Sequence, residues 1–210
     1  MTGKLTPVSE LAQDLAGETR GNALRRGLVA LGGVVGGGAL LAWLPEAARS
    51  ARGPAQDVRI LNFVYLLESL EDAFYREAIK RGKLRGDMRD FARIVGRHES
   101  AHVAFLKGTL GKKARKIPSF DFGDATGSRH RFATTAILLE DTGVYAYNGQ
   151  ATSLTQDALR AAARIVSVEA RHAAWIRALA GRSPAVDATD ALLTEAQVMK
   201  RIRKTGFIKS

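Results

Sequence analysis

The chain of 210 residues contains no cysteine and only five prolines. The absence of cysteine excludes disulfide bonds, thiol chemistry and metal sites with Cys ligands. It also argues against an electron supply from a Cys-ligated iron domain. The scarcity of proline leaves long segments rich in Ala, Leu, Val, Arg and Glu uninterrupted, which favours helices. Hydrophobic residues make up 46% of the chain, which is typical of a protein with a core of its own.

Acidic residues are too few to balance the basic ones, since 21 Asp and Glu face 32 Lys and Arg, for a net charge of +11. Residues 1–50 hold five basic and four acidic residues, so the excess belongs to the rest of the chain. Its densest runs are KKARK at 112–116 and KRIRK at 200–204. No aromatic residues are interleaved with these runs and no nucleic-acid-binding motif accompanies them. We therefore interpret the charge as solvated basic surface and expect no specific nucleic-acid partner.

The first fifty residues differ from the rest of the chain. Arg25 and Arg26 directly precede an apolar, glycine-rich run over 27–44, and small residues follow it. This order of basic, apolar and small residues is typical of a signal segment, and the paired arginines resemble a twin-arginine export signal. The match is incomplete, because Leu24 replaces the usual Ser or Thr and 48–50 only approximates a cleavage site.

An uncleaved membrane anchor is the alternative interpretation of this segment. The run over 27–44 would reach about 27 Å as a helix, which is a marginal length for a bilayer. Its glycines spaced four apart would suit contact with another helix, and the protein would then belong to a larger membrane complex. A buried glycine-rich helix of a soluble protein is the least favoured interpretation. Both leading interpretations place the body of the protein in the periplasm or another extracytoplasmic space.

Helical periodicity dominates from about residue 57. It predicts one helical hairpin over 57–110, with its turn near residue 84, and a second over 129–180, with its turn near residue 154. The residues between the hairpins show no sustained period and form a long connection. Two short-looped hairpins joined in this way are typical of a ferritin-like four-helix bundle.

The body is therefore expected to be all-α. We divide the chain into a signal or anchor segment at 1–50, the four-helix bundle at 51–183, and a C-terminal helix with a basic tail at 184–210. The last helix is predicted to run over 187–204, because this stretch is amphipathic.

The motif Glu-x-x-His occurs in the second and in the fourth predicted helix. The first copy is Glu99 and His102, and the second is Glu169 and His172. Residues three apart share one face of a helix, so each pair can act together. The surrounding segments RHESAHVAFL and SVEARHAAWI align with each other, which indicates a weak internal repeat.

The same repeat aligns a glutamate of the first predicted helix with one of the third. LLESLEDAFY carries Glu68 and LLEDTGVYAY carries Glu140 at the matching position. Each of the four glutamates, these two and the two of the Glu-x-x-His motifs, lies about 15 residues from the turn of its hairpin. The differences between these distances amount to no more than about one helical turn. In antiparallel hairpins, all four should meet at one depth of the bundle.

Four carboxylates at one level of an apolar bundle would repel one another and lose their solvation unless cations balanced them. Four carboxylates and two imidazoles suit iron or manganese better than copper or a closed structural zinc site. We therefore predict a site for two Fe or Mn ions, and the ligand set accepts either metal. Its ligands are predicted to be Glu68, Glu99, His102, Glu140, Glu169 and His172.

The chain resembles a known family through LNFVYLLESLEDAFY, ESAHVAFL, FDFGD, LLEDTGVYAYNG and IVSVEARHAAWIRAL, all within 57–180. It is similar to secreted ferritin-like domain proteins, which include desiccation-related proteins and share a superfamily with rubrerythrins, bacterioferritins and manganese catalases. The resemblance implies a fold and a site more than a reaction. It implies that Glu68 and Glu140 are terminal ligands and that Glu99 and Glu169 are bridging ligands. It also implies that His102 and His172 supply one imidazole to each metal.

Two further acidic residues are assigned places around these ligands. Glu71 shares a face with Glu68, but its repeat partner is Gly143, so a place beside the ligands or on the helix surface is favoured. Asp141 is the best carboxylate candidate to orient a ligand histidine from outside.

The remaining tyrosine and histidine candidates are interpreted as non-ligands. Tyr75 and Tyr147 each lie seven residues after an aligned glutamate, and core packing is favoured over a hydrogen bond across the bundle. His98 is adjacent to Glu99, hence about 100° from it around the helix, and is not expected to be a ligand.

Two functions remain open on these grounds, and no catalytic residue is assigned. The first is an exported dinuclear metalloprotein with oxidoreductase chemistry on peroxide, O2 or Fe(II), acting alone or as a homo-oligomer. The second is a membrane-anchored structural or interaction subunit of a larger complex, without catalysis.

Overall fold

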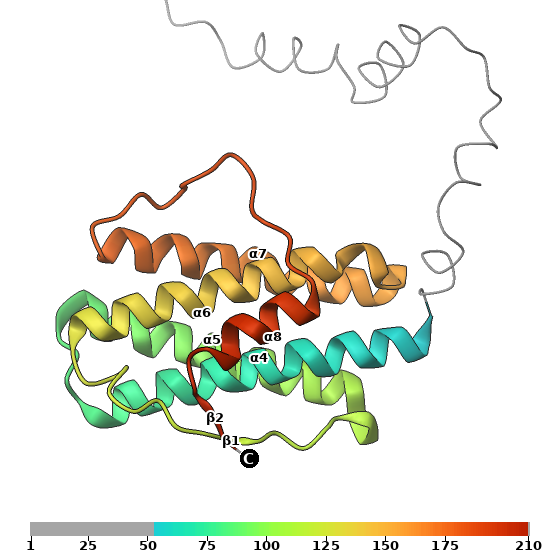
Figure 1. Ribbon diagram of the computed structural model, residues 1–210, viewed down its shortest axis with the longest axis horizontal. Coiled ribbons are helices and arrows are strands. Elements are labelled where there is room, and N and C mark those ends of the chain that lie inside the picture. Colours follow the sequence, from blue (N-terminus) through green and yellow to red (C-terminus); the bar gives the residue numbers. More distant parts are fainter. Residues whose placement is uncertain (1–52, 210) are drawn as a thin grey trace, which may run out of the picture. The chain divides into compact units, whose positions relative to one another are not determined.

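Two antiparallel helical hairpins form the body of the computed structural model, which describes residues 53–209 (Figure 1). The first hairpin consists of α4 (Pro54–Arg81) and α5 (Gly86–Leu110), and the second of α6 (Arg129–Gln150) and α7 (Gln156–Leu179). Short 3-10 turns, η2 (Gly111–Lys113) and η3 (Ala151–Ser153), follow α5 and α6. The expectation of a mainly α-helical body with two hairpins and a long connection is confirmed.

Local sequence signals set several of the helix ends. Pro54 stands in the first turn of α4, where its missing N–H costs nothing. Gly82 ends this helix in the left-handed region at φ 62°, a conformation that favours glycine. Ser128 precedes α6, and its side chain accepts a hydrogen bond from the backbone N–H of Arg131.

A cluster of buried aromatic rings closes one end of the bundle. The rings of Phe74 and Phe132 stack with centroids 5.3 Å apart. Tyr75 contacts both of these rings edge-on, and Phe91 contacts Phe132 and Tyr75 edge-on. All four side chains are fully buried. The cluster fixes the rotation of α4 against α6, and therefore the direction in which their polar residues point.

The long connection and the C-terminus are tied together outside the bundle. β1 (Ser119–Phe120) pairs antiparallel with β2 (Ile208–Lys209), and α8 (Glu195–Arg203) lies across α4 and α6 (Figure 1). Buried Val198 and Ile202 pack α8 against the core. The predicted start of the last helix near residue 187 is wrong: α8 begins only after Thr194, which forms a capping box with Gln197.

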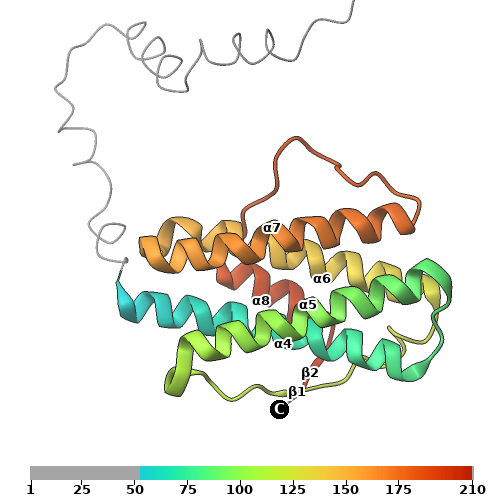
Figure 2. The ribbon, with the colours of Figure 1, turned by 180° about the vertical axis from the view of Figure 1, so that it is seen from behind.

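Seen from behind, α5 and α7 lie in front, and within residues 53–209 no further element covers the seam between them (Figure 2). The bundle is therefore covered by α8 on one side only. The segment interpreted as signal or anchor lies outside the described residues. None of the helices in the described part is both long enough and apolar enough to span a bilayer.

Candidate metal centre

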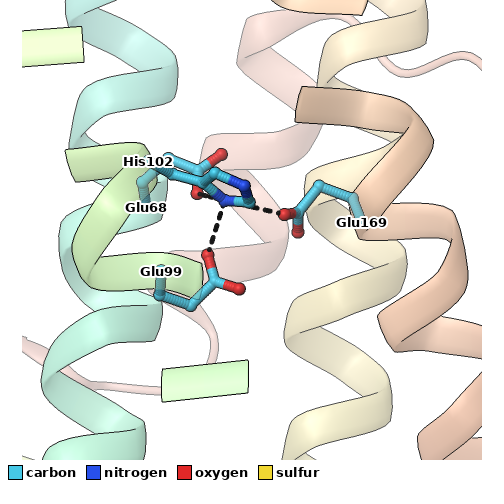
Figure 3. A group of neighbouring side chains, drawn as sticks. All are labelled: Glu68, Glu99, His102 and Glu169. Atoms are coloured by element: carbon cyan, nitrogen blue, oxygen red, sulfur yellow. Dashed lines mark hydrogen bonds and ion pairs between the residues drawn. The ribbon is translucent and has the colours of Figure 1, made fainter. Parts of the chain in front are cut away.

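Six side chains from the four long helices converge in the middle of the bundle. They form two groups, and within each group one donor atom per residue lies within 4.8 Å of all the others. One group is Glu68, Glu99, His102 and Glu169 (Figure 3), and the other is Glu99, Glu140, Glu169 and His172. The structure thus brings together all the residues that the sequence singles out as ligands, and two of the glutamates belong to both groups.

Both histidines direct Nδ1 toward the carboxylates. His102 Nδ1 lies 3.1 Å from Glu68 Oε2, 3.2 Å from Glu99 Oε2 and 3.1 Å from Glu169 Oε1. His172 Nδ1 lies 3.1 Å from Glu99 Oε1 and 3.3 Å from Glu140 Oε2. Glu99 therefore offers one oxygen to each histidine, as a carboxylate shared between two sites would.

Burial and crowding shift the protonation of the cluster. Burial and the charges of the other carboxylates raise the pKa of Glu99 and Glu169 well above the usual range. Burial is the largest single effect on Glu68 and acts in the same direction, but the hydrogen bond and charge of His102, together with the hydrogen bonds of Glu99 and Tyr147, outweigh it and lower the pKa of Glu68. Burial would lower the pKa of His102, yet three carboxylates raise it to about 12. Without cations, the cluster therefore holds protons that its residues would lose in water.

Several polar atoms in the cluster are buried and form no well-directed hydrogen bond, although some of them lie within ion-pair distance of a histidine nitrogen. They are Glu71 Oε2, Glu99 Oε1, Glu140 Oε2, both side-chain oxygens of Glu169, and His172 Nδ1. A buried polar atom without a partner costs about 1–3 kcal/mol, and more when it is charged. A set of donor atoms that consists mostly of carboxylate oxygens, with a few imidazole nitrogens, matches the donors that divalent iron and manganese prefer. The residues present therefore fit a pair of such ions.

Two tyrosines hold the outer carboxylates from across the bundle. Tyr147 on α6 donates a hydrogen bond of 2.7 Å to Glu68 Oε1 on α4, and Tyr75 on α4 donates one to Glu140 Oε1 on α6. Both tyrosines are buried core residues, as the sequence indicates, but their hydroxyl groups face the site. The two bonds mirror each other, as the internal repeat requires.

Glu71 is a fifth buried carboxylate beside the site, with a side chain that is only 2% exposed. It faces Gly143, where a Cβ atom would lie 3.4 Å from Glu71 Oε1 and 3.3 Å from Glu169 Oε2. Burial and the charges of Glu169 and Glu140 raise the pKa of Glu71 well above the usual range. The missing side chain at position 143 thus makes room for this extra carboxylate, which lies beside the ligands and not on the helix surface.

The structure corrects one expectation about the surroundings of the histidines and adds a contact that was not expected. Asp141 does not orient a histidine, because it forms an ion pair with Arg177 on α7 instead. The ring of His172 is contacted by His98, whose Nδ1 lies 2.9 Å from His172 Nε2. His98 precedes His102 by four residues, so both share the face of α5 that meets α7. His98 belongs to neither group of donor atoms, in agreement with the expectation that it is not a ligand, but it contacts one of the ligand histidines.

Comparison with known proteins bears on the same part of the chain. A family model with the description "Ferritin-like domain" matches residues 56–182, and no curated protein matches the chain. The matched segment starts in α4 and ends just after α7, so it includes the whole bundle and all six converging side chains.

Proposed function

The chain belongs to the ferritin-like domain family, and we propose that its bundle binds two iron or manganese ions and performs redox chemistry on a small substrate. The substrate would be hydrogen peroxide, O2 or Fe(II). The observation that carries the proposal is the set of buried carboxylate and imidazole atoms that converge from four helices, several of them without a hydrogen bond. Fold alone would not support it, because one fold serves many functions.

The two groups of donor atoms support one assignment of the ligands. Glu99 and Glu169 would bridge the ions, because both belong to each group. The outer ligands would be Glu68 with His102 for one ion, and Glu140 with His172 for the other. Iron or manganese bound there would supply a redox couple and Lewis acidity toward small oxygen compounds.

The remaining contacts describe what the protein itself contributes. Tyr75 and Tyr147 hold the outer carboxylates in place and supply two hydroxyl protons next to them. The bundle excludes water, since the ligand glutamates are at most 1% exposed. The side chain of His102 is 12% exposed, so the seam between α5 and α7 is the side on which solvent comes closest to the ligands. Such a site suits substrates of a few atoms only.

Metal loading tests the proposal directly. Purified protein reconstituted with Fe(II) or Mn(II) under argon should hold close to two ions per chain after desalting, as measured by elemental analysis. The loaded protein should consume peroxide or oxidise Fe(II), whereas Glu99→Ala should do neither. Absence of bound metal in the wild type would overturn the proposal. Two tightly bound ions without turnover of peroxide, O2 or Fe(II) would instead support the structural role.

We further propose that the protein is exported, on the strength of the sequence pattern over 24–50. Expression in a bacterium with an intact twin-arginine export route should then place it outside the cytoplasm, and replacing Arg25 and Arg26 with lysine should retain it inside. The mass of the N-terminus distinguishes the two forms of the proposal. A shortened chain indicates a cleaved signal, and an intact chain in the membrane fraction indicates an anchor. A protein that is intact and remains in the cytoplasm would contradict both.

A further inference from the structure

His98 makes an unusual contact for a residue at the surface of the bundle. It lies on α5 and is exposed, yet its ring stacks on that of the buried His172, with centroids 5.1 Å and planes 18° apart. Its Nδ1 lies 2.9 Å from His172 Nε2, within hydrogen-bonding distance. The contact therefore joins the outer nitrogen of a candidate ligand to a second imidazole at the protein surface.

The geometry determines which nitrogen carries the proton when a metal is bound. His172 directs Nδ1 toward Glu99 and Glu140, so Nδ1 is the nitrogen that would bind a metal. Its proton must then be on Nε2, because a neutral imidazole has one N–H. This N–H can donate to His98 Nδ1, which leaves the proton of His98 on its own Nε2. An outer partner of this kind fixes the tautomer and the orientation of a metal-binding histidine.

The other candidate ligand histidine lacks such a partner. The position aligned with His98 in the internal repeat is Val168, which has no hydrogen-bonding side chain. Among residues 53–209, His102 forms its hydrogen bonds through Nδ1 alone, and its side chain is more exposed than that of His172, at 12% against 3%. The two halves of the site are therefore built unequally, although their ligands match.

We propose that His98 is a positioning residue for His172 and makes the two metal sites unequal in affinity. The ion held by Glu140 and His172 is retained, and the ion held by Glu68 and His102 exchanges with solution. The inference rests on the proposed dinuclear site. It adds that the chain uses one histidine outside the ligand set to bias which ion is released first.

Release of Mn(II) tests this proposal without reference to activity. Protein loaded with two Mn(II) ions is mixed with excess chelator, and the loss of protein-bound Mn(II) is followed by electron paramagnetic resonance. The wild type should release one ion fast and the other slowly. His98→Ala should speed the slow phase about 10–100-fold, the usual effect of losing an outer hydrogen-bonding partner, and leave the fast phase unchanged.

Two companion variants separate positioning from loosening of the fold. His98→Asn places an amide oxygen near the former Nδ1 and should restore much of the slow phase, since it can still accept from His172. His130→Ala removes an exposed histidine at the start of α6 and should change neither phase. Equal release of both ions in the wild type would overturn the proposal, as would acceleration of both phases alike in His98→Ala or no rescue by His98→Asn. Failure of the wild type to bind Mn(II) at all would instead count against the dinuclear site itself.

Discussion

Replacing Glu99 with glutamine is expected to remove both bound metal ions, whereas the same change at Glu68 should remove only one. Glutamine keeps the size of the side chain but replaces a charged carboxylate with a neutral amide, which is a poor ligand for Fe(II) or Mn(II). Glu99 offers an oxygen to each histidine and belongs to both groups of donor atoms, while Glu68 belongs to one. The expected loss of affinity is at least about a hundredfold, more than the loss of an outer partner usually costs.

Elemental analysis and thermal unfolding would measure this difference. Metal at a thousandfold excess over its dissociation constant stabilises a folded protein by about 4 kcal/mol, or roughly 8–16 °C in melting temperature for a chain of this size. The wild type should gain such a shift on addition of Mn(II), Glu68→Gln should gain less, and Glu99→Gln almost none. Glu195→Gln changes a partly exposed glutamate on α8, which pairs with Arg59 away from the site, and should gain the same shift on addition of Mn(II) as the wild type. Equal losses in Glu68→Gln and Glu99→Gln would contradict the shared role of Glu99.

The long helices and the convergence of the six side chains could be predicted because both depend on local spacing. Gly82 and Gly111 follow the first two helices directly, so their ends were visible in the sequence. The Glu-x-x-His spacing places each pair on one face, and equal distances from the hairpin turns place all four glutamates at one level. Neither inference needs any knowledge of how the helices are rotated against one another.

Contacts that depend on that rotation could not be predicted. His98 reaches His172 across the seam between α5 and α7, and Asp141 reaches Arg177 between α6 and α7. The start of α8 also depends on tertiary structure. The backbone N–H of Leu193 donates to the carbonyl of Tyr145 on α6, which fixes the residues just before α8 outside the helix despite their amphipathic pattern. Propensity is overridden where a segment finds its partners elsewhere in the fold.

The stability of the metal-free protein is expected to fall as the pH rises from about 5 to about 8. Glu71, Glu99 and Glu169 have raised pKa values in the folded state, so the folded chain keeps protons that the unfolded chain loses above about pH 4.5. His102 acts in the same direction, because its pKa of about 12 exceeds the usual value of 6.5. Its stabilising effect is complete below pH 6.5 and is lost as the pH rises toward 12. Each proton that only the folded state keeps costs about 1.4 kcal/mol of stability per pH unit.

Bound metal should reverse this trend, because ligands must lose their protons to bind it and metal affinity therefore rises with pH. Melting temperatures measured from pH 5 to pH 8, in a chelator and in excess Mn(II), should diverge as the pH increases. Glu71→Gln offers a matched test, since it removes one buried acid at nearly constant volume without removing a proposed ligand. It should flatten the decline of the metal-free protein and leave the number of bound ions at two. A metal-free protein that became more stable toward pH 8 would mean that the buried carboxylates are balanced without metal, and the need for a cation pair in this bundle would disappear with it.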